Sequence, residues 1–387
     1  MIRLELTADT LGPLRRGHPW VYTSGLAQPN ERPPAGTPVQ LVDAKGKPAA
    51  FGLADDGPIA VRVLDRHPES IDSLIRRRLL AAAEIRPSLV PSNTNAYRVV
   101  NGEGDGLPGL IVDRYDHTLV VRLYGACWEP HLESIVHTAK SIEGIETVMR
   151  RFGVRRVDGR EGATVLDGPD PGEPIVVTEA GLRFLARPVT GQKTGLFLDQ
   201  REHRIRMARH CQGKTLVNLF AYNGGFSVHA AAAGAKRVLS VDIAAAALED
   251  AKENFRLNGL NPDEHGFFAT DVFKWKPDEL ADAVICDPPS LTHGKDSDGS
   301  ARKAYRDLAT LSGGMVRPGG LLASASCTAR LNWDRWEQAV REGSAKAGRW
   351  SWLWRAAEPP DHPVAMGHPE GRYLKFALLT RHKSRFD

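Results

Sequence analysis

Cysteine is scarce in this sequence, and long apolar runs are absent. The 387 residues include four cysteines that lie far apart and form no C-x-x-C pair: Cys127, Cys211, Cys286 and Cys327. This spacing argues against a metal site and against a disulfide scaffold, and it is typical of a reducing cytoplasm. No apolar run approaches the roughly 20 residues of a membrane-spanning helix, and residues 1–20 lack the apolar segment of a secretory signal. We therefore expect a cytoplasmic protein with no metal and no membrane partner.

The charge is nearly balanced over the whole chain but is clustered locally. The formal net charge is +4, which excludes few classes of protein. Basic residues gather at 15–16, 76–78 and 149–156. Such clusters can hold phosphate groups, although a solvated surface is the commoner meaning of any one of them. The charge is thus a weak indication of a nucleic-acid partner.

The length and the strand-like runs divide the chain into several parts. A chain of 387 residues exceeds one ordinary hydrophobic core. Residues 1–68 alternate turn formers with short β-like runs, which predicts a small β-barrel. Residues 69–187 combine a helical stretch at 70–85 with several short strands, which predicts an α+β domain. The polar segment 156–174 is rich in glycine and proline and predicts an exposed loop.

From residue 188 to residue 387 the pattern changes to strands that alternate with helices. Strand-like runs at 215–222, 237–243, 282–286 and 320–327 are separated by helical segments. This alternation is the pattern of a parallel sheet covered by helices. The expected fold class of this part is therefore α/β, as a Rossmann-like domain.

The loop F-A-Y-N-G-G-F-S at 220–227 joins an expected strand to an expected helix. Gly224 and Gly225 allow the backbone to approach a ligand. Asp242 ends the next strand, where an acid can bind the two hydroxyls of a ribose. Asp271 ends a third strand and can meet an adenine edge. Because the loop lacks G-x-G-x-x-G and a P-loop lysine, dinucleotides and ATP fit poorly, and S-adenosylmethionine is the expected cofactor.

A fourth expected strand ends in Asp287-Pro288-Pro289. The prolines stiffen the turn and present the carboxylate at the carboxyl edge of the sheet, where a planar base with an amino group can be held. A rigid turn with a capping acid would explain the same residues. The neighbouring strand ends, which suit a nucleotide, favour the functional interpretation.

The four cysteines have different expected roles. Cys286 precedes the acid inside a strand and is interpreted as a core residue, and Cys127 and Cys211 are expected to be inert. Cys327 closes a strand in S-A-S-C-T. A core role is the commoner one for any cysteine, but a thiolate beside Asp287 has the parts needed to attack carbon 6 of a pyrimidine ring.

The segment G-Q-K-T-G-L-F-L-D-Q-R-E-H-R at 191–204 also carries candidate residues. Lys193 can contact a phosphate or order a loop, and Asp199 and Arg204 can bind the amino or carboxylate end of a cofactor. A salt-bridged linker between domains is the alternative interpretation. Asp105 and Asp113, farther upstream, are interpreted as turn residues.

Several of these motifs together resemble one known family. The motifs are the segments 191–204, N-L-F-A-Y-N-G-G-F-S, V-D-I at 241–243, D-P-P-S, S-C-T, D-H-P-V-A-M-G-H-P-E-G-R-Y-L-K at 361–375, R-R-G-H-P-W-V-Y at 15–22 and V-V-N-G-E-G-D-G-L-P-G-L-I-V-D-R-Y at 99–115. In combination they are similar to the PUA-domain-containing ribosomal RNA cytosine-C5 methyltransferases. The resemblance covers nearly the whole chain.

This resemblance implies a PUA barrel at 1–68, an α+β middle domain at 69–187 and a class I methyltransferase domain at 188–387. It also implies methylation of carbon 5 of a cytosine in 23S ribosomal RNA, with Cys327 as the nucleophile and Asp287 bonded to the cytosine. The sequence departs from the family pattern at Asn223 and Thr328, and at L-T-H-G-K (291–295) after Ser290.

The candidate site residues follow from the motifs and from the resemblance. The expected catalytic residues are Cys327 and Asp287. The expected cofactor-binding residues are Asp199, Arg204, Asn218, Phe220, Ala221, Tyr222, Asn223, Gly224, Asp242, Ile243, Asp271, Val272 and Asp287. The expected substrate-binding residues are Lys193, Pro288, Pro289 and Ser290.

Two other functions are compatible with the sequence. An RNA methyltransferase that acts on an exocyclic amino group would use the Asp-Pro-Pro motif and would need no cysteine. A catalytically inactive assembly factor would keep the fold and the binding of ribosomal RNA without turnover. The sequence leaves open a homodimer and does not identify the nucleotide.

Overall fold

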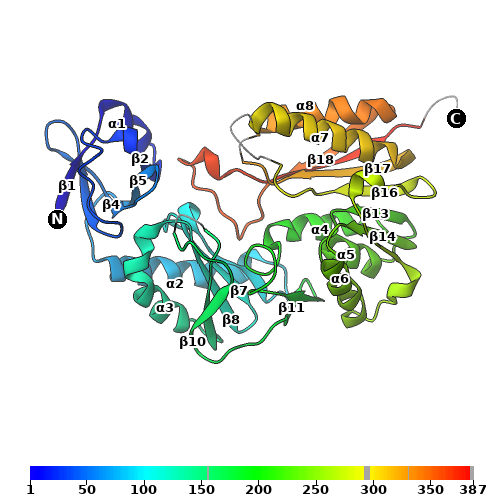
Figure 1. Ribbon diagram of the computed structural model, residues 1–387, viewed down its shortest axis with the longest axis horizontal. Coiled ribbons are helices and arrows are strands. Elements are labelled where there is room, and N and C mark those ends of the chain that lie inside the picture. Colours follow the sequence, from blue (N-terminus) through cyan, green and yellow to red (C-terminus); the bar gives the residue numbers. More distant parts are fainter. Residues whose placement is uncertain (155–156, 292–296, 330, 384–387) are drawn as a thin grey trace. The chain divides into compact units, whose positions relative to one another are not determined.

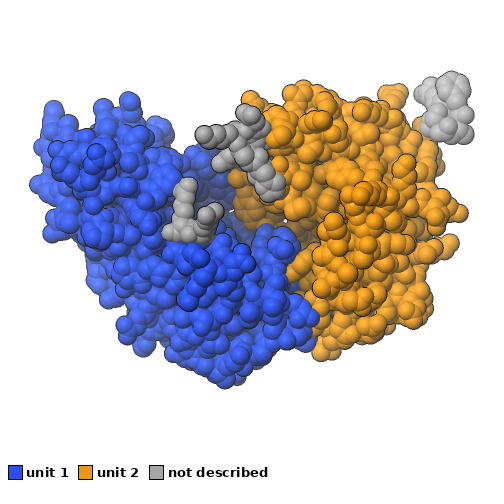
Figure 2. All heavy atoms as spheres, in the orientation of Figure 1, with its two compact units in different colours: residues 1–178, 186–198, 360–371 blue, residues 179–185, 199–359, 372–387 orange. Residues whose placement is uncertain are grey.

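The computed structural model describes residues 1–154, 157–291, 297–329 and 331–383. The chain forms two compact units, which Figure 2 shows in different colours. Unit 1 consists of residues 1–178, 186–198 and 360–371, and unit 2 consists of residues 179–185, 199–359 and 372–387. Neither unit is one continuous segment. Within the described ranges, no helix is both long enough and apolar enough to cross a membrane.

Unit 1 begins with a five-stranded sheet in the order β1-β3-β4-β5-β2. Its elements are β1 (Ile2–Glu5), α1 (Ala8–Arg15), β2 (Trp20–Tyr22), β3 (Pro38–Val42), β4 (Pro48–Ala54) and β5 (Ile59–Asp65). Side chains such as Val39, Leu41 and Val61 are buried in one apolar cluster, because the short strands place a row of β-branched and leucine side chains on the inner face. The expected small β domain is confirmed.

The middle part of unit 1 is a second sheet, in the order β10-β9-β8-β7-β6, together with two helices. Its elements are α2 (Ile71–Leu89), β6 (Ala96–Asn101), β7 (Leu110–Tyr115), β8 (Thr118–Leu123), α3 (Leu132–Lys140), β9 (Thr147–Arg151) and β10 (Ala163–Asp167). The prediction that 156–174 is only a loop was wrong in part, because Ala163–Asp167 pairs antiparallel with β9. β11 (Ile175–Glu179) and β12 (Leu182–Ala186) follow as a two-stranded sheet.

Asp113 does not lie in a turn, as the sequence suggested, but inside β7, where its side chain is fully buried. The carboxylate accepts hydrogen bonds from Arg98 Nε at 2.6 Å and from Thr194 Oγ1 at 2.5 Å. Thr194 Oγ1 also lies 2.9 Å from Tyr115 Oη. Asp113 thus fixes the loop around residue 194 to the middle sheet.

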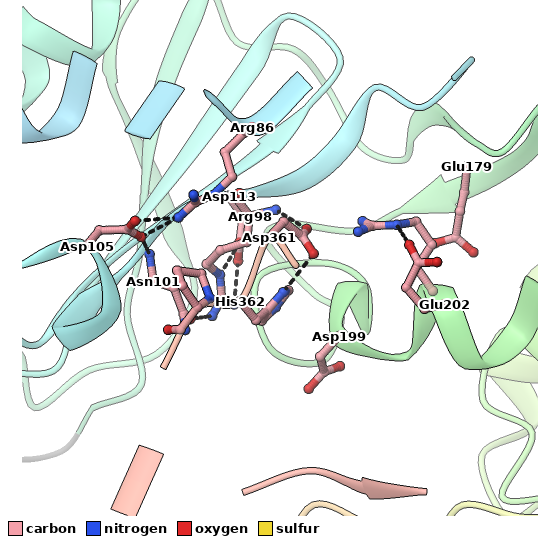
Figure 3. A network of polar contacts seen from close by, with 12 residues as sticks. Arg86, Arg98, Asn101, Asp105, Asp113, Glu179, Asp199, Glu202, Asp361 and His362 are labelled. Carbon is pink, nitrogen blue, oxygen red and sulfur yellow. Dashed lines mark hydrogen bonds and ion pairs between the residues drawn. The ribbon is translucent and has the colours of Figure 1, made fainter. Parts of the chain in front are cut away.

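Residues 360–371 form a strap that belongs to unit 1, although it connects two strands of unit 2. Asp361 is buried and accepts a hydrogen bond from the backbone N–H of Arg98 at 3.1 Å. Asn101 Nδ2 donates to the carbonyl of Pro363 at 2.9 Å. Figure 3 shows this polar network around Arg98, Asn101 and Asp361. The strap is therefore bound to β6 through Arg98 and Asn101.

The described part of unit 2 contains a seven-stranded sheet in the order β15-β14-β13-β16-β17-β19-β18. Its elements are α4 (Arg201–Ala208), β13 (Thr215–Leu219), α5 (Gly225–Ala232), β14 (Arg237–Asp242), α6 (Ala245–Leu257), β15 (Gly266–Ala269), β16 (Ala281–Cys286), α7 (Ser297–Gly314), β17 (Val316–Ser326), α8 (Trp333–Ser344), β18 (Trp350–Ala356) and β19 (Lys375–Arg381). α7 and α8 cover one face, and α4, α5 and α6 lie on the other (Figure 1). The expected α/β class is confirmed.

Candidate active site

The carboxyl ends of four parallel strands meet at one edge of the unit 2 sheet. β13 pairs in parallel with β14 and with β16, and β16 pairs in parallel with β17. The register aligns Leu219 with Cys286, and Cys286 with Ser324. The segments that follow these strands therefore lie side by side, as expected for a binding site in an open α/β sheet. These segments carry the glycine loop, Asp287 and Cys327, and Asp242 is the last residue of β14.

The glycine loop has an unusual backbone. Phe220 and Tyr222 have φ angles of +59° and +49°, and Gly224 has a φ angle of +79°. Side chains rarely tolerate this left-handed region, and such strain gathers at functional sites. A Cβ atom at Gly224 would also lie 2.8 Å from the Cβ of Ala251. The loop therefore has a fixed backbone conformation immediately before the first residue of α5, and its backbone is open to a ligand at Gly224.

Asp242 is held firmly but keeps acceptor capacity. Its Oδ2 accepts a hydrogen bond from the N–H of Tyr222, and its Oδ1 accepts one from the N–H of Ala244, both at 2.8 Å. A carboxylate offers about four lone-pair positions, so two remain for the hydroxyls of a ribose. Ile243, the next residue, is 77% exposed and offers an apolar surface beside that position.

Other predicted cofactor residues make contacts that support the loop. Asn218 is buried in β13, and its Nδ2 donates to Ser227 Oγ at 2.9 Å. The side chain of Asn223 donates to the carbonyl of Leu185 at 3.3 Å. Asp271 accepts a hydrogen bond from the N–H of Phe273 at 3.0 Å and so caps a short 3-10 helix. Ala221 and Val272 are buried.

Asp287 is oriented by two residues, Gln200 and His203, that were not among the expected site residues. Gln200 Nε2 donates to Asp287 Oδ1 at 2.9 Å. Gln200 Oε1 lies 2.6 Å from Nδ1 of His203. Burial lowers the pKa of His203 to about 4, so the imidazole is neutral at pH 7 and its Nδ1–H donates to Gln200. This fixes the Gln200 amide with its NH₂ group toward Asp287.

Gln200 and His203 lie in the segment D-Q-R-E-H-R at 199–204. Their spacing of three residues was the only sign in the sequence that their side chains could act together. Residues three apart on a helix share one face. Gln200 ends the 3-10 helix Leu198–Gln200, and His203 lies in α4. The sequence did not show that this face meets Asp287, which is far away along the chain.

Cys327 differs from the other three cysteines in its exposure. Cys127, Cys211 and Cys286 are buried, whereas Cys327 is partly exposed. Burial raises the pKa of Cys286 to about 12 and that of Cys211 to about 11, and it raises the pKa of Cys127 well above its usual value. These three thiols are therefore poor nucleophiles, and the core role expected for Cys286 is confirmed.

Asp199 and Arg204, which were expected to bind the amino or carboxylate end of the cofactor, both contact other residues of the protein. Asp199 accepts a hydrogen bond from Tyr373 Oη at 2.7 Å. Arg204 forms a two-point pair with Glu179, with distances of 2.7 Å and 2.5 Å between its nitrogens and the carboxylate. His229 Nε2 lies 2.9 Å from the same carboxylate. A role of Arg204 in cofactor binding stays a prediction.

Replacing Glu179 with glutamine should lower the free energy of unfolding at pH 7 by about 3 kcal/mol, because it leaves the buried Arg204 cation unpaired. Burial alone would raise the pKa of Glu179, but Arg204 and His229 hold it well below its usual value of 4.5. The stabilisation is therefore complete above about pH 4.5 and is lost as the pH falls toward the depressed pKa. Urea unfolding at pH 7 and pH 4 measures both effects.

Glu249→Gln is the matched control for this prediction. Glu249 is exposed on α6 and pairs with Lys252 at 2.7 Å. An exposed pair of this kind contributes less than about 1 kcal/mol. A loss at Glu179→Gln no larger than the loss at Glu249→Gln would contradict the prediction.

The predicted substrate residues fall in different places. Pro288 is buried, and Pro289 and Ser290 are exposed after β16. Lys193 belongs to unit 1, where its Nζ lies 4.6 Å from the centre of the Phe197 ring. Most of the segment L-T-H-G-K, from residue 292, lies outside the described residues. The substrate roles stay predictions.

The sheet order and the site at its carboxyl edge define an α/β nucleotide-binding enzyme fold preceded by a small β domain. Residues 126–370 match the family model of the S-adenosylmethionine-dependent methyltransferases, and residues 4–66 match that of the PUA-like domain. The chain belongs to the S-adenosylmethionine-dependent methyltransferase family.

Named relatives align over almost the full chain. A ribosomal RNA large subunit methyltransferase from Deinococcus radiodurans is 38% identical over 98% of this chain and 97% of its own length. Ribosomal RNA large subunit methyltransferase I from Erwinia tasmaniensis is 34% identical over 97% and 98%. A solved structure of a proposed methyltransferase in complex with SAH has a TM-score of 0.88, at 23% identity over 98% and 100%.

The cofactor of the protein is S-adenosylmethionine, and the site fits it. Asp242 keeps two acceptor positions that would suit the hydroxyls of a ribose, and the exposed apolar side chain of Ile243 would suit a base. Gly224 has a φ angle in the left-handed region and carries no side chain, so a ligand could lie directly against the backbone of the glycine loop. When it is bound, the cofactor supplies an electrophilic methyl group.

Proposed function

We propose that the protein methylates carbon 5 of a cytosine in 23S ribosomal RNA through a covalent adduct with Cys327. The main observation in support of this proposal is that Asp287 and Cys327 directly follow β16 and β17, two adjacent parallel strands in which Cys286 is in register with Ser324. A partly exposed thiol and a carboxylate are thereby brought to one edge of the sheet. The names of the relatives from Deinococcus radiodurans and Erwinia tasmaniensis support large-subunit ribosomal RNA as the substrate.

In the proposed reaction the Cys327 thiolate adds to carbon 6 of the cytosine and makes carbon 5 nucleophilic. Asp287 accepts a hydrogen bond from the amino group, or from ring nitrogen 3 after that nitrogen has taken a proton from water, and this contact orients the ring and stabilises the adduct. After methyl transfer a base removes the proton from carbon 5. The electron pair of that C–H bond then restores the double bond and expels the thiolate.

Unit 1 offers a surface for RNA on the N-terminal β domain. A groove of about 970 Å³ is lined by residues of α1, of β2 and of the strap, among them Arg16, His18, Trp20 and Tyr22. Tyr22 is 42% exposed. Aromatic rings can stack on unpaired bases, and a basic side chain can contact a phosphate. The target base must also leave its stack to reach an active site of this kind.

Nucleoside mass spectrometry tests the proposal. Ribosomal RNA from cells with and without the gene should differ by one 5-methylcytidine in the large-subunit RNA, and a plasmid copy should restore it. A missing N4-methylcytidine or N2-methylguanosine would instead favour the amino-directed reaction. No missing methyl group would favour the inactive assembly factor.

A further inference from the structure

Lys375 is a buried cation at the active-site end of the sheet. It begins β19 and pairs in register with Ser326, the residue before Cys327. Only 1% of its surface is exposed. Its Nζ donates hydrogen bonds to the carbonyls of Thr328 at 3.0 Å and of Tyr373 at 2.9 Å. The ammonium group is thus held against the backbone that carries Cys327.

The surroundings of Lys375 compensate its charge only in part. Burying an ammonium group is costly unless it is hydrogen-bonded and paired with an anion. The two carbonyls use two of its three N–H donors. Among the residues that the structure describes, no carboxylate lies within ion-pair distance of Nζ, and the third donor has no protein partner.

The charged and titratable groups around this position come from several elements. Burial lowers the pKa of Lys375 to about 8, while Glu358, before the strap, and Cys327 raise it. Burial raises the pKa of Tyr305 of α7, and Cys327 and Asp287 raise it further. Neither the carboxyl group of Asp287 nor the hydroxyl group of Tyr305 carries a positive charge, so neither of these two groups attracts a thiolate at Cys327.

We propose that the ammonium group of Lys375 stabilises the thiolate of Cys327 and so activates it as a nucleophile. Lys375 is a positioning residue in this scheme, because it acts through Cys327 and contacts no substrate atom. The hydrogen bonds to Thr328 and Tyr373 hold the cation in place before RNA binds. The catalytic consequence of this pairing rests on the proposed function, but the pairing itself does not.

The pH dependence of alkylation at Cys327 tests this inference. Iodoacetamide reacts with thiolates, and peptide mass spectrometry separates Cys327 from the three buried cysteines. A nearby opposite charge lowers the pKa of an acid by about 1 to 3 units. Lys375→Met should therefore raise the pKa of Cys327 by at least about 1 unit, which lowers the alkylation rate at pH 7 about tenfold.

Three further variants make the result specific. Lys375→Arg keeps the charge and should restore most of the rate, whereas Lys375→Gln keeps a donor without charge and should behave like Lys375→Met. The glutamine variant also serves if the methionine variant does not fold. Lys303→Met removes an exposed lysine of α7 and should leave the pKa unchanged. A Cys327 pKa that changes by less than about 0.3 unit in a folded, neutral variant would overturn the inference.

This experiment separates the inference from the proposed function. Alkylation needs neither RNA nor S-adenosylmethionine, so it reports the pairing even if the substrate is different. A raised pKa in Lys375→Met without formation of 5-methylcytidine by the wild type would remove the proposed function alone. Formation of 5-methylcytidine with an unchanged pKa would remove the inference alone.

Discussion

Replacing Cys327 with alanine is expected to lower the turnover number for methylation of the RNA by at least about a thousandfold. In the proposed mechanism the variant lacks the thiolate that adds to carbon 6, and carbon 5 of a cytosine without this adduct attacks a methyl group only very slowly. Transfer of a radiolabelled methyl group to large-subunit RNA from the deletion strain measures the effect. Binding of S-adenosylmethionine, measured by calorimetry, should be unchanged.

Cys286→Ala provides the matched control for this experiment. Cys286 is the last residue of β16, the strand that pairs with β17, and it is buried in the core of unit 2. Its replacement should leave the turnover number within about twofold and lower the free energy of unfolding by about 1 kcal/mol, because a small cavity remains. Full activity of Cys327→Ala would remove the covalent mechanism and leave the amino-directed reaction.

Replacing Asp287 with asparagine should lower the turnover number by about a hundredfold to a thousandfold, as is found when one stabilising hydrogen-bond partner of a transition state is removed. The amide cannot offer the negative charge that supports a protonated ring nitrogen. It also brings an NH₂ group toward the Nε2 of Gln200, which donates to Asp287 in the wild type. Rates at saturating S-adenosylmethionine and saturating RNA measure the loss.

Asp242→Ala separates catalysis from cofactor binding. Asp242 accepts two backbone hydrogen bonds and keeps two acceptor positions, which we predict to bind the hydroxyls of the ribose. Its replacement should weaken S-adenosylmethionine binding by about tenfold to a hundredfold and change the turnover number at saturating cofactor much less. If Asp287→Asn shows the same pattern as Asp242→Ala, Asp287 serves cofactor binding and not the chemistry on the base.

The site edge could be predicted because parallel strands place their carboxyl ends together. The apolar runs before the glycine loop, Asp242, Asp287 and Cys327 were visible in the sequence, and each became a strand at the expected place. The alternation of strands and helices then determined that these four ends meet. This inference needed only local patterns and one general rule of sheet topology.

The partners of these residues could not be predicted, because they depend on contacts between distant segments. The sequence predicted a turn residue at Asp113, but its carboxylate is buried and accepts a hydrogen bond from Thr194, 81 residues later. Gln200 reaches Asp287 across 87 residues. Lys375 contacts Thr328 from a strand that runs antiparallel to β17. None of these pairs leaves a periodic pattern in the sequence.

β10 shows a different reason for a wrong prediction. Its residues, Ala163–Asp167, stand in a segment rich in glycine and proline, which favours a loop. Pairing with β9 at the edge of the middle sheet outweighs this local preference. Tertiary pairing commonly decides the fate of short strands of this kind.

The strap between β18 and β19 has a consequence for dividing the protein. The chain passes from one unit to the other at residues 178–179, 185–186, 198–199, 359–360 and 371–372. A cut near residue 187 would leave the buried Asp361 without the Arg98 backbone that it binds. The N-terminal and C-terminal halves of the chain therefore cannot be exchanged independently between relatives. A chimaera would have to take the strap from the same relative as the N-terminal half.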